Sequence, residues 1–354
     1  MPATTVLVVD DSALMRKVLR QILLDAGDFE VHTARNGADA LEQIGRVEPD
    51  VVTLDVNMPE MDGLTCLAEI MRERPRPVVM VSSLTEHNAL VTLEALQLGA
   101  VDYVPKPGGT VSLNLADVTQ ELVRKVRSAA AARPSRAQGL RQRLRAQRER
   151  ARIEEPPPAR TRPARVELVL IGSSTGGPAL LSELLPQLPA SLPAPVVVAQ
   201  HIPATFTAPL ARRLDEVCQL RVQEVDRTTP VRPGNVYIGR GNADVVVARC
   251  PDGLVVKSVP ASDEYHWRPS VDRLVASARR DCDPSRLVCV LLTGMGDDGA
   301  AEMAAVKQAG GRTIAESEET AVVWGMPGEL ARRGGATEVL PSHAIVGRLV
   351  EWTS

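Results

Sequence analysis

The chain has 354 residues, which is enough for two or three domains with sizeable apolar cores. Its composition, 44% hydrophobic and 24% charged, is typical of globular proteins, and no apolar run approaches the ~18 residues of a membrane span. We therefore expect a protein that is not embedded in a membrane. The five cysteines show no Cys-x-x-Cys spacing, and the first ten residues lack the features of a signal peptide. We expect a cytoplasmic protein without disulfides or a Cys-based zinc site.

The net charge of −3 hides a strongly basic segment. Residues 133–165 contain eleven Arg and three Glu, a local charge of +8. Such a segment fits either an arm that binds an acidic partner or nucleic acid, or a solvated linker. Because it is rich in Arg, Ala and Pro and interrupts a regular pattern on both sides, we expect an interdomain linker over 131–165. With only eight aromatic residues in the chain, we expect no nucleic-acid partner.

Residues 1–130 alternate short apolar segments with amphipathic ones. Five such strand–helix units predict an α/β domain with one doubly wound parallel sheet, in which chemistry lies beyond the carboxyl ends of the strands. The expected strands are Thr5–Val9, Phe29–Ala34, Asp50–Leu54, Val78–Ser82 and Ala100–Val104, and the expected helices are Ser12–Ala26 and residues 37–46, 63–72, 88–98 and 115–130.

The alternation resumes at Val166, which predicts a second α/β domain over 166–354. Residues 251–253, Pro-Asp-Gly, separate two strand-like segments and predict an antiparallel hairpin inserted into this domain. The expected strands are Glu167–Ile171, Val196–Gln200, Arg221–Glu224, Asn235–Gly239, Asp244–Arg249, Leu254–Val259, Leu287–Thr293 and Thr313–Ala315, and the expected helices are Ala179–Leu185, one that ends at Leu214, and residues 270–280 and 299–309.

Charged and polar side chains follow the strands of the first domain. Asp10 and Asp11 come after the first strand, and Asp55 comes after the third. Clustered carboxylates repel one another unless a cation joins them, and oxygen ligands suit Mg²⁺. One carboxylate would then act as a nucleophile toward a phosphoryl donor, while Lys106 and Ser82, after the fifth and fourth strands, would contact the new phosphoryl oxygens. Helix N-capping explains Asp10 or Asp11 alone, but not the whole set.

These residues resemble the response-regulator receiver domain over about residues 4–128. The resemblance rests on the Asp10-Asp11 pair, on residues 54–59 (Leu-Asp-Val-Asn-Met-Pro) followed by Asp-Gly at 62–63, on Ser82 and on the Lys-Pro pair at 106–107. It implies a flavodoxin-like fold in which Asp55 accepts a phosphoryl group from a histidine kinase. It also implies that Asp10, Asp11, Asp55 and the backbone carbonyl of Asn57 form the Mg²⁺ site.

Residues 171–178, Ile-Gly-Ser-Ser-Thr-Gly-Gly-Pro, form a small-residue turn between a strand and a helix. Such a turn either cradles a phosphate or presents a serine nucleophile. The pattern is not Gly-x-Gly-x-x-Gly, and no acidic residue ends the next strand, which disfavours a dinucleotide. Instead His201 follows that strand and an Asp-Asp pair at 297–298 follows a later one, which fits a Ser–His–Asp triad. Spacing alone does not choose between Ser173 and Ser174, or between the two aspartates.

Several segments of the second half resemble the chemotaxis protein-glutamate methylesterase catalytic domain, and with the receiver in front the resemblance spans nearly the whole chain. They are residues 171–177, 200–203 (Gln-His-Ile-Pro), 268–272 (Arg-Pro-Ser-Val-Asp), 292–299 (Leu-Thr-Gly-Met-Gly-Asp-Asp-Gly) and 325–327 (Gly-Met-Pro). The resemblance implies a Rossmann-like esterase fold with Ser174 as nucleophile, His201 as general base and acid, and Asp298 orienting His201. Thr175 and the Met295 backbone are candidates for oxyanion stabilisation.

One departure from that family lies at residues 265–267, Tyr-His-Trp, where relatives often carry another basic residue. Arg268 is therefore only a candidate substrate contact, and His266 is a second one.

The resemblance implies phosphorylation-activated hydrolysis of glutamate methyl esters on the cytoplasmic helices of chemoreceptors, releasing methanol, and also deamidation of receptor glutamines. It implies a chemotaxis histidine kinase as phosphodonor, Mg²⁺ for receiver phosphorylation and no cofactor for ester hydrolysis. Two alternatives are a catalytically silent adaptor that binds receptors or kinase, and a receiver-controlled DNA-binding regulator that uses the basic segment. The filled triad positions disfavour the adaptor, and the lack of a helix-turn-helix pattern disfavours the regulator.

Overall fold

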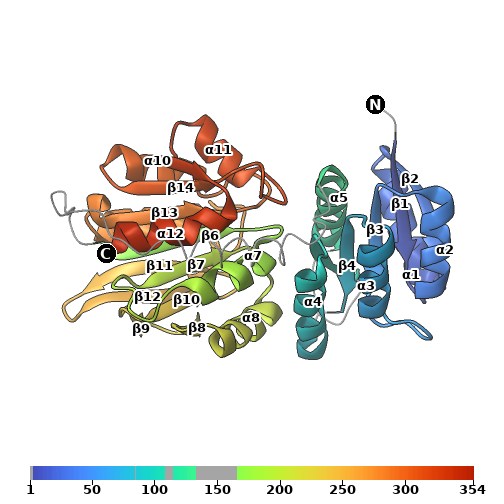
Figure 1. The fold of residues 1–354 in the computed structure, drawn as a ribbon, viewed down its shortest axis with the longest axis horizontal. Helices are drawn as coiled ribbons and strands as arrows, with labels where there is room; N and C mark the ends of the chain where they lie inside the picture. Colours follow the sequence, from blue (N-terminus) through green and yellow to red (C-terminus); the bar gives the residue numbers. More distant parts are fainter. Residues whose placement is uncertain (1–2, 84, 108–114, 133–165) are drawn as a thin grey trace. The chain divides into compact units, whose positions relative to one another are not determined.

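The computed structural model describes residues 3–83, 85–107, 115–132 and 166–354 (Figure 1). These residues form two compact units, one on each side of residues 133–165. We call them the N-terminal unit (within 3–132) and the C-terminal unit (166–354). The predicted linker at 131–165 lies, apart from its first two residues, outside the described residues and stays a prediction.

The N-terminal unit is built on a five-stranded parallel sheet in the order β2-β1-β3-β4-β5, which confirms the flavodoxin-like prediction. Helices α2, α3 and α4 contact one another in sequence, while α1 contacts α5. The strands are β1 (Thr4–Val9), β2 (Phe29–Ala34), β3 (Val51–Asp55), β4 (Val78–Ser82) and β5 (Asp102–Pro105), and the helices are α1 (Ala13–Asp25), α2 (Gly37–Val47), α3 (Gly63–Glu73), α4 (Glu86–Leu98) and α5 (Leu115–Ala131).

Local chemistry explains where these elements lie. Strands β3 and β4 are buried along their whole length and rich in Val, as expected for central strands of a parallel sheet. Four helices begin at a side chain that accepts a hydrogen bond from a backbone N–H of the first turn. Each such cap contributes about 1 kcal/mol, so the sequence defines these starts locally. The caps are Ser12, Asn36, Asp62 and Thr85.

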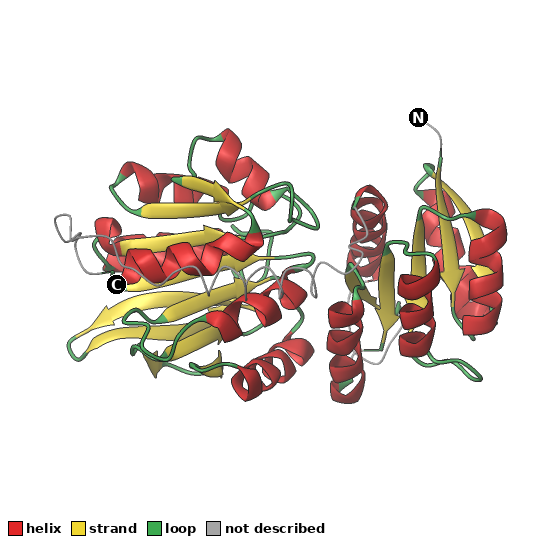
Figure 2. Cartoon of the chain, in the orientation of Figure 1, coloured by secondary structure: helices red, strands yellow, loops and turns green. Residues whose placement is uncertain are grey.

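The C-terminal unit has a seven-stranded parallel sheet in the order β15-β14-β13-β6-β7-β10-β8, and Figure 2 shows helices lying against it. Its strands are β6 (Leu168–Ser173), β7 (Val196–Gln200), β8 (Arg221–Val225), β10 (Asn235–Gly239), β13 (Leu287–Leu291), β14 (Arg312–Glu316) and β15 (Glu338–Leu340). Its helices are α7 (Gly177–Leu184), α8 (Ala204–Val217), α9 (Val271–Asp281), α10 (Ala300–Gln308), α11 (Met326–Arg332) and α12 (Ser342–Thr353), with single 3₁₀ turns at η1 (Leu185–Gln187) and η2 (Pro284–Arg286).

The predicted antiparallel insertion is present as a separate three-stranded sheet. Strands β11 (Ala243–Cys250) and β12 (Gly253–Pro260) pair along their full length across the Pro251-Asp252 turn, and Gly253 accepts the positive φ that the turn requires. The short strand β9 (Thr229–Pro230) pairs with β12. Strand β11 packs on α9, and the two share one buried core with β6, β7 and β13.

Some elements differ from the predicted ones. The helices α11 and α12 and the strands β9 and β15 were not predicted, and β13 ends at Leu291 rather than at Thr293. The early end has a physical cause, because the backbone N–H of Thr293 donates to the Glu316 carboxylate at 2.7 Å instead of to a neighbouring strand.

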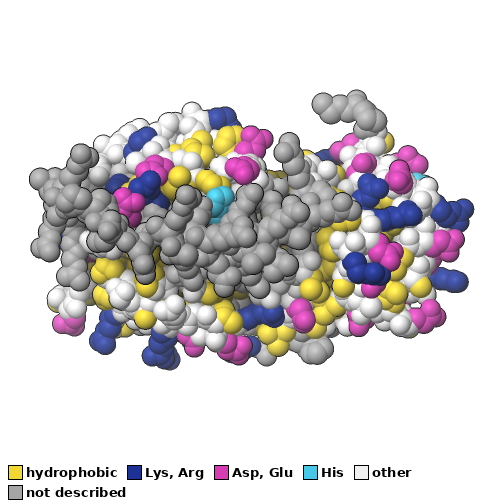
Figure 3. Space-filling view, in the orientation of Figure 1, with side chains coloured by type: hydrophobic (Ala, Val, Ile, Leu, Met, Phe, Trp, Pro, Cys, Tyr) yellow, Lys and Arg dark blue, Asp and Glu magenta, His cyan; other side chains and the backbone are white. Residues whose placement is uncertain are grey.

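On the face shown in Figure 3, Lys and Arg side chains of the described residues are interspersed with Asp and Glu side chains. Within the described residues, no helix combines the length and the apolar character needed to cross a bilayer.

Candidate functional site

The first site lies at the carboxyl edge of the N-terminal sheet, where the strand order reverses between β1 and β3. Asp10 follows β1, Asp55 ends β3, and Lys106 follows β5. Lys106 Nζ lies 2.9 Å from Asp10 Oδ2 and 2.8 Å from Asp55 Oδ2, and both carboxylates are buried. The structure therefore brings together the acids and the amine that the sequence placed after separate strands.

The electrostatics of this pocket favour a further cation. Burial raises the pKa of Asp55, and the negative charge of Asp10 adds to the effect, while the ammonium of Lys106 opposes it. Carboxylate oxygens of Asp10, Asp11 and Asp55 all lie within 4.8 Å of one another. Three carboxylates beside one ammonium leave a surplus of negative charge, and an all-oxygen donor set is the one that Mg²⁺ prefers. The residues present therefore fit a magnesium ion.

Two other predicted residues border this pocket. Ser82 is buried at the end of β4, and its carbonyl accepts the backbone N–H of Lys106 at 2.9 Å. This hydrogen bond fixes the backbone of Lys106 beside β4. The backbone N–H of Asn57 works to lower the pKa of Asp55, and the side-chain amide of Asn57 donates to Asn88 at 3.2 Å. The role of its carbonyl as a metal ligand stays a prediction.

The second site lies at the carboxyl edge of the C-terminal sheet, where β6 runs through a tight turn into α7. Ser173 ends β6, is fully buried, and donates its hydroxyl to Gln200 Oε1 at 2.6 Å. Ser174 comes next, and its Oγ makes no hydrogen bond to any described residue. The same Gln200 donates its amide to the carbonyls of Ser174 and His201, at 3.0 and 2.9 Å. Gln200 thus holds the serine turn against the end of β7.

Two glycines make this turn fit. Gly176 has φ +79°, a conformation that favours glycine, and immediately precedes α7. Gly294, after β13, lies so close to the serine that an added Cβ would be 2.8 Å from Ser174 Cβ and 2.3 Å from Met326 Sδ. The backbone N–H of Ser174 donates to the Thr293 carbonyl at 3.0 Å. The serine turn and the loop after β13 are therefore packed directly together.

His201 and Asp298 form a buried pair. His201 Nε2 lies 2.8 Å from Asp298 Oδ2, and the other ring nitrogen, Nδ1, is buried and has no partner among the described residues. Ser173 and Gln200 are paired in register, so Ser174 and His201 leave the sheet side by side. Asp297 is exposed and lies 3.8 Å from Arg333 instead. The geometry therefore places Asp298, rather than Asp297, on the histidine.

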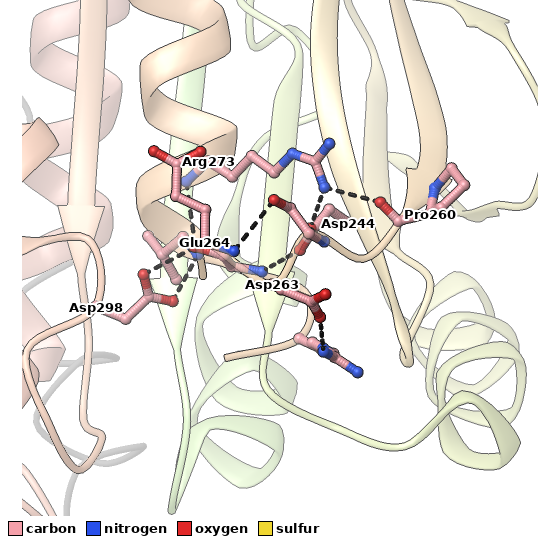
Figure 4. A network of polar contacts seen from close by, with 10 residues as sticks. Asp244, Pro260, Asp263, Glu264, Arg273 and Asp298 are labelled. Carbon is pink, nitrogen blue, oxygen red and sulfur yellow. Dashed lines mark hydrogen bonds and ion pairs between the residues drawn. The ribbon is translucent and has the colours of Figure 1, made fainter. Parts of the chain in front are cut away.

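Asp298 is held by the start of α9. Its carboxylate accepts the backbone N–H groups of Val271 at 2.7 Å and Asp272 at 2.9 Å, and the hydroxyl of the N-cap Ser270 at 3.0 Å. Figure 4 shows Asp298 on one side of this segment and Asp244 on the other, where Asp244 accepts the backbone N–H of Ser270 at 2.7 Å. A carboxylate at a helix N-terminus is stabilised in its charged form.

The pKa values near this pair follow from the same contacts. Burial of Asp298 works to raise its pKa, but the histidine and the two backbone N–H groups outweigh it, and the pKa lies below its usual range. Burial and the charge of Asp298 raise the pKa of the neighbouring Asp272 to about 6. Of the two acids, Asp298 therefore keeps its charge to lower pH, and its ionised form is the one that suits a carboxylate paired with a histidine.

The candidate oxyanion groups lie around the same turn. Thr175 is buried, and its carbonyl accepts the Thr293 hydroxyl at 2.9 Å. The backbone N–H of Met295 donates to no group of the described residues and follows Gly294, which packs on Ser174. Behind this loop the buried Glu316 accepts the backbone N–H of Thr293, a contact that was not predicted from the sequence although Glu316 ends a buried strand, as Asp55 does.

Arg268 and His266 lie on an exposed segment beside the site. Arg268 Nη2 is 3.5 Å from Asp263, a solvent-exposed pair that holds it weakly. The rings of His266 and Trp267 meet edge to face, with centroids 5.0 Å apart. The structure keeps both predicted residues accessible, and their contact with substrate stays a prediction.

The chain is similar to known proteins along nearly its full length. The model of the response regulator receiver domain matches residues 6–116, and that of the CheB methylesterase matches residues 169–349. A protein-glutamate methylesterase/protein-glutamine glutaminase of Rhodopseudomonas palustris is 56% identical over 98% of this chain and 97% of its own length. One of Rhodospirillum rubrum is 54% identical over 99% of this chain and 96% of its own length.

A solved structure agrees with the second half. The crystal structure of the Thermotoga maritima CheB methylesterase catalytic domain is 39% identical, with a TM-score of 0.51, and covers 53% of this chain and 99% of that one. The strand-end acids, the serine turn and the His–Asp pair thus occur in a chain that matches both domain models in order. The chain belongs to the family of receiver-linked CheB protein-glutamate methylesterases/protein-glutamine glutaminases.

Proposed function

We propose that this chain hydrolyses glutamate methyl esters on chemoreceptors, releasing methanol, and deamidates receptor glutamines. We further propose that phosphorylation of the N-terminal unit activates both reactions. The observation that carries this proposal is the buried His201–Asp298 pair beside Ser174, in a chain of this family. We divide the chain functionally into a receiver domain (1–130), a linker (131–165) and a catalytic domain (166–354).

Ser174, His201 and Asp298 have the proposed roles of nucleophile, base and orienting acid. Because Asp298 occupies Nε2 of His201, the nitrogen left to take the Ser174 proton is Nδ1. Ser174 Oγ then bonds to the ester carbonyl carbon, and methanol leaves with the proton from His201. Water attacks the resulting acyl-enzyme with His201 again taking a proton, which releases glutamate. A glutamine side chain follows the same course with ammonia as the leaving group.

Groups around the turn would stabilise the transition state and hold the substrate. The N–H of Met295, which donates to none of the described residues, and the neighbouring Thr175 are the proposed donors to the oxyanion. Arg268, exposed beside the site, is proposed to contact carboxylates next to the modified position, with His266 as a second contact. The reaction needs no cofactor in this scheme.

In the N-terminal unit, Asp55 is proposed to accept a phosphoryl group from a chemotaxis histidine kinase. Asp10, Asp11, Asp55 and the Asn57 carbonyl would hold Mg²⁺, which supplies charge neutralisation when bound. Lys106 and Ser82 would contact the phosphoryl oxygens. A phosphoryl group brings about −1.5 to −2 charges, enough to shift a two-state regulatory equilibrium. The five free cysteines agree with action in the cytoplasm.

The test is methanol release from methyl-esterified chemoreceptor by the full chain, with and without a small phosphodonor and Mg²⁺. The wild type should release methanol faster with the donor, and Asp55→Asn should not respond to it. Ser174→Ala should lose on the order of 10⁴-fold in rate or more.

Other results would point elsewhere. If the wild type releases no methanol but binds receptor, the chain is an adaptor. A salt-dependent shift of duplex DNA in place of hydrolysis would indicate a DNA-binding regulator. Activity that survives in Ser174→Ala would show that another group is the nucleophile.

A further inference from the structure

Trp267 lies face to face with the imidazole ring of His201. The two ring centroids are 5.1 Å apart, and the ring planes differ by only 4°. The indole also lies against the loop after β13. A Cβ added to Gly296 in that loop would lie 3.0 Å from the Trp267 ring. Trp267 thus contacts both the histidine and the loop that carries Asp298.

One carboxylate accepts hydrogen bonds from both ends of the segment that carries Trp267. Asp244, buried at the start of β11, accepts the backbone N–H of Ser262 at 3.3 Å and that of Ser270 at 2.7 Å. Arg273 forms an ion pair with the same carboxylate and donates to the Pro260 carbonyl at 2.8 Å (Figure 4). Residues 262–270 therefore form a loop that is closed at its base, and Trp267 is held over the site by this closure.

We propose that Trp267 is a positioning residue for His201: its indole face keeps the imidazole in the plane that directs Nδ1 to Ser174 and stabilises the imidazolium formed during acylation. The inference deepens the proposed esterase function and rests on it for the identity of the base. Asp298 fixes only one ring nitrogen, so rotation about that hydrogen bond is limited by what lies on the ring faces.

A parallel stack suits this role better than simple packing or substrate binding does. Aromatic faces attract a cation placed over them, so the indole would favour the charged ring over the neutral one. The histidine side chain is nearly buried, and the parallel, offset indole covers part of one of its faces. A residue that only contacted substrate would have no reason to lie parallel to His201 in the free protein.

The experiment compares full-length wild type, Trp267→Ala and Trp267→Phe in two assays. One is steady-state methanol release from methylated chemoreceptor. The other is the rate at which phenylmethylsulfonyl fluoride modifies Ser174, followed by mass spectrometry with Ser174→Ala as the blank. In that reaction Ser174 Oγ bonds to sulfur, fluoride leaves, and His201 Nδ1 takes the hydroxyl proton, so the rate reports the serine–histidine pair without receptor binding.

The matched control is Trp352→Ala. Trp352 also lies in the C-terminal unit and contacts a charged side chain, with Arg312 5.2 Å from its ring centroid, but it belongs to α12. We expect Trp267→Ala to lower kcat and the sulfonylation rate by a similar factor, on the order of 3- to 30-fold, with KM unchanged. Trp267→Phe should recover most of the loss, and Trp352→Ala should change neither rate.

The proposal is overturned if Trp267→Ala is sulfonylated at the wild-type rate, if only KM rises, or if Trp352→Ala loses as much activity. Failure of the wild type to release methanol would refute the proposed substrate, while the sulfonylation series would still decide the role of Trp267. Circular dichroism checks folding. If Trp267→Ala does not fold, Trp267→Leu replaces it, because leucine fills space without a π face and should react more slowly than Trp267→Phe.

Discussion

Glu316 is a fully buried carboxyl group at the carboxyl end of β14, and replacing it by glutamine tests the cost of its ionisation. Burial raises the pKa of Glu316 to about 7 from an ordinary value of 4.5. Hydrogen bonds from the Thr320 hydroxyl at 2.9 Å and the Thr293 N–H at 2.7 Å lower this pKa, but by less than burial raises it. Glutamine keeps a carbonyl acceptor for Thr293 and cannot ionise.

The raised pKa of Glu316 determines how the free energy of unfolding changes with pH. An acid with a raised pKa in the folded state favours folding while it is protonated, so stability is lost as the pH rises from about 4.5 to about 7. At about 1.4 kcal/mol per pKa unit, the loss is at most about 3 kcal/mol. We therefore expect Glu316→Gln to raise the free energy of unfolding by about 2–3 kcal/mol more at about pH 8.5 than at about pH 5.

The assay is urea unfolding followed by tryptophan fluorescence. All three tryptophans, Trp267, Trp324 and Trp352, lie in residues 166–354, so the signal reports the unit that contains Glu316. The control is Glu319→Gln, an exposed neighbour that should give the same small change at both pH values. The reasoning is refuted if the gain of Glu316→Gln is equal at both pH values, because Glu316 would then not carry a raised pKa.

Three further predictions concern the two sites. Asp298→Asn should lower kcat for methanol release on the order of 10⁴-fold with KM unchanged, since the histidine loses the group that fixes its tautomer; a loss confined to KM would contradict this. Lys106→Ala should destabilise the N-terminal unit by about 3–5 kcal/mol in calorimetry, because two buried carboxylates lose their cation, and added Mg²⁺ should restore part of it. Stability unaffected by Mg²⁺ would argue against the metal site. Gly294→Ala should slow sulfonylation of Ser174 by at least about tenfold, because the new methyl group would clash with the serine side chain. An unchanged rate would show that the loop shifts to accommodate the methyl group without displacing Ser174.

Much of the fold was predictable because its signals are local. The central strands are runs of apolar residues, the helix starts carry their own caps, and the Pro251–Gly253 turn marks the hairpin. The missed elements have weak local signals. Strand β15 has three residues with an exposed Val339, and β9 has two. Helix α11 has Pro327 and Gly328 in its first turn, residues that resemble a loop in sequence.

The site was predictable where its residues follow strands and unpredictable where it depends on contacts between distant segments. Ser174, His201 and Asp298 each come after a strand, so topology alone brings them to one edge. In contrast, nothing local links Asp244 to a loop 18 and 26 residues further along the chain. The stacking of Trp267 on His201 depends on that closure, so the sequence indicated only that the position is unusual.

Asp298 has a consequence for how this enzyme can change by mutation. Active-site groups are commonly strained, so their removal often stabilises a protein at the expense of activity. Here the carboxylate that contacts His201 also accepts hydrogen bonds from two N–H groups and the N-cap hydroxyl at the start of α9. In the proposed mechanism, catalytic activity and helix stability therefore depend on the same oxygens. Substitutions at this position should lose both properties together, and selection for a more stable protein would preserve this aspartate as firmly as selection for activity.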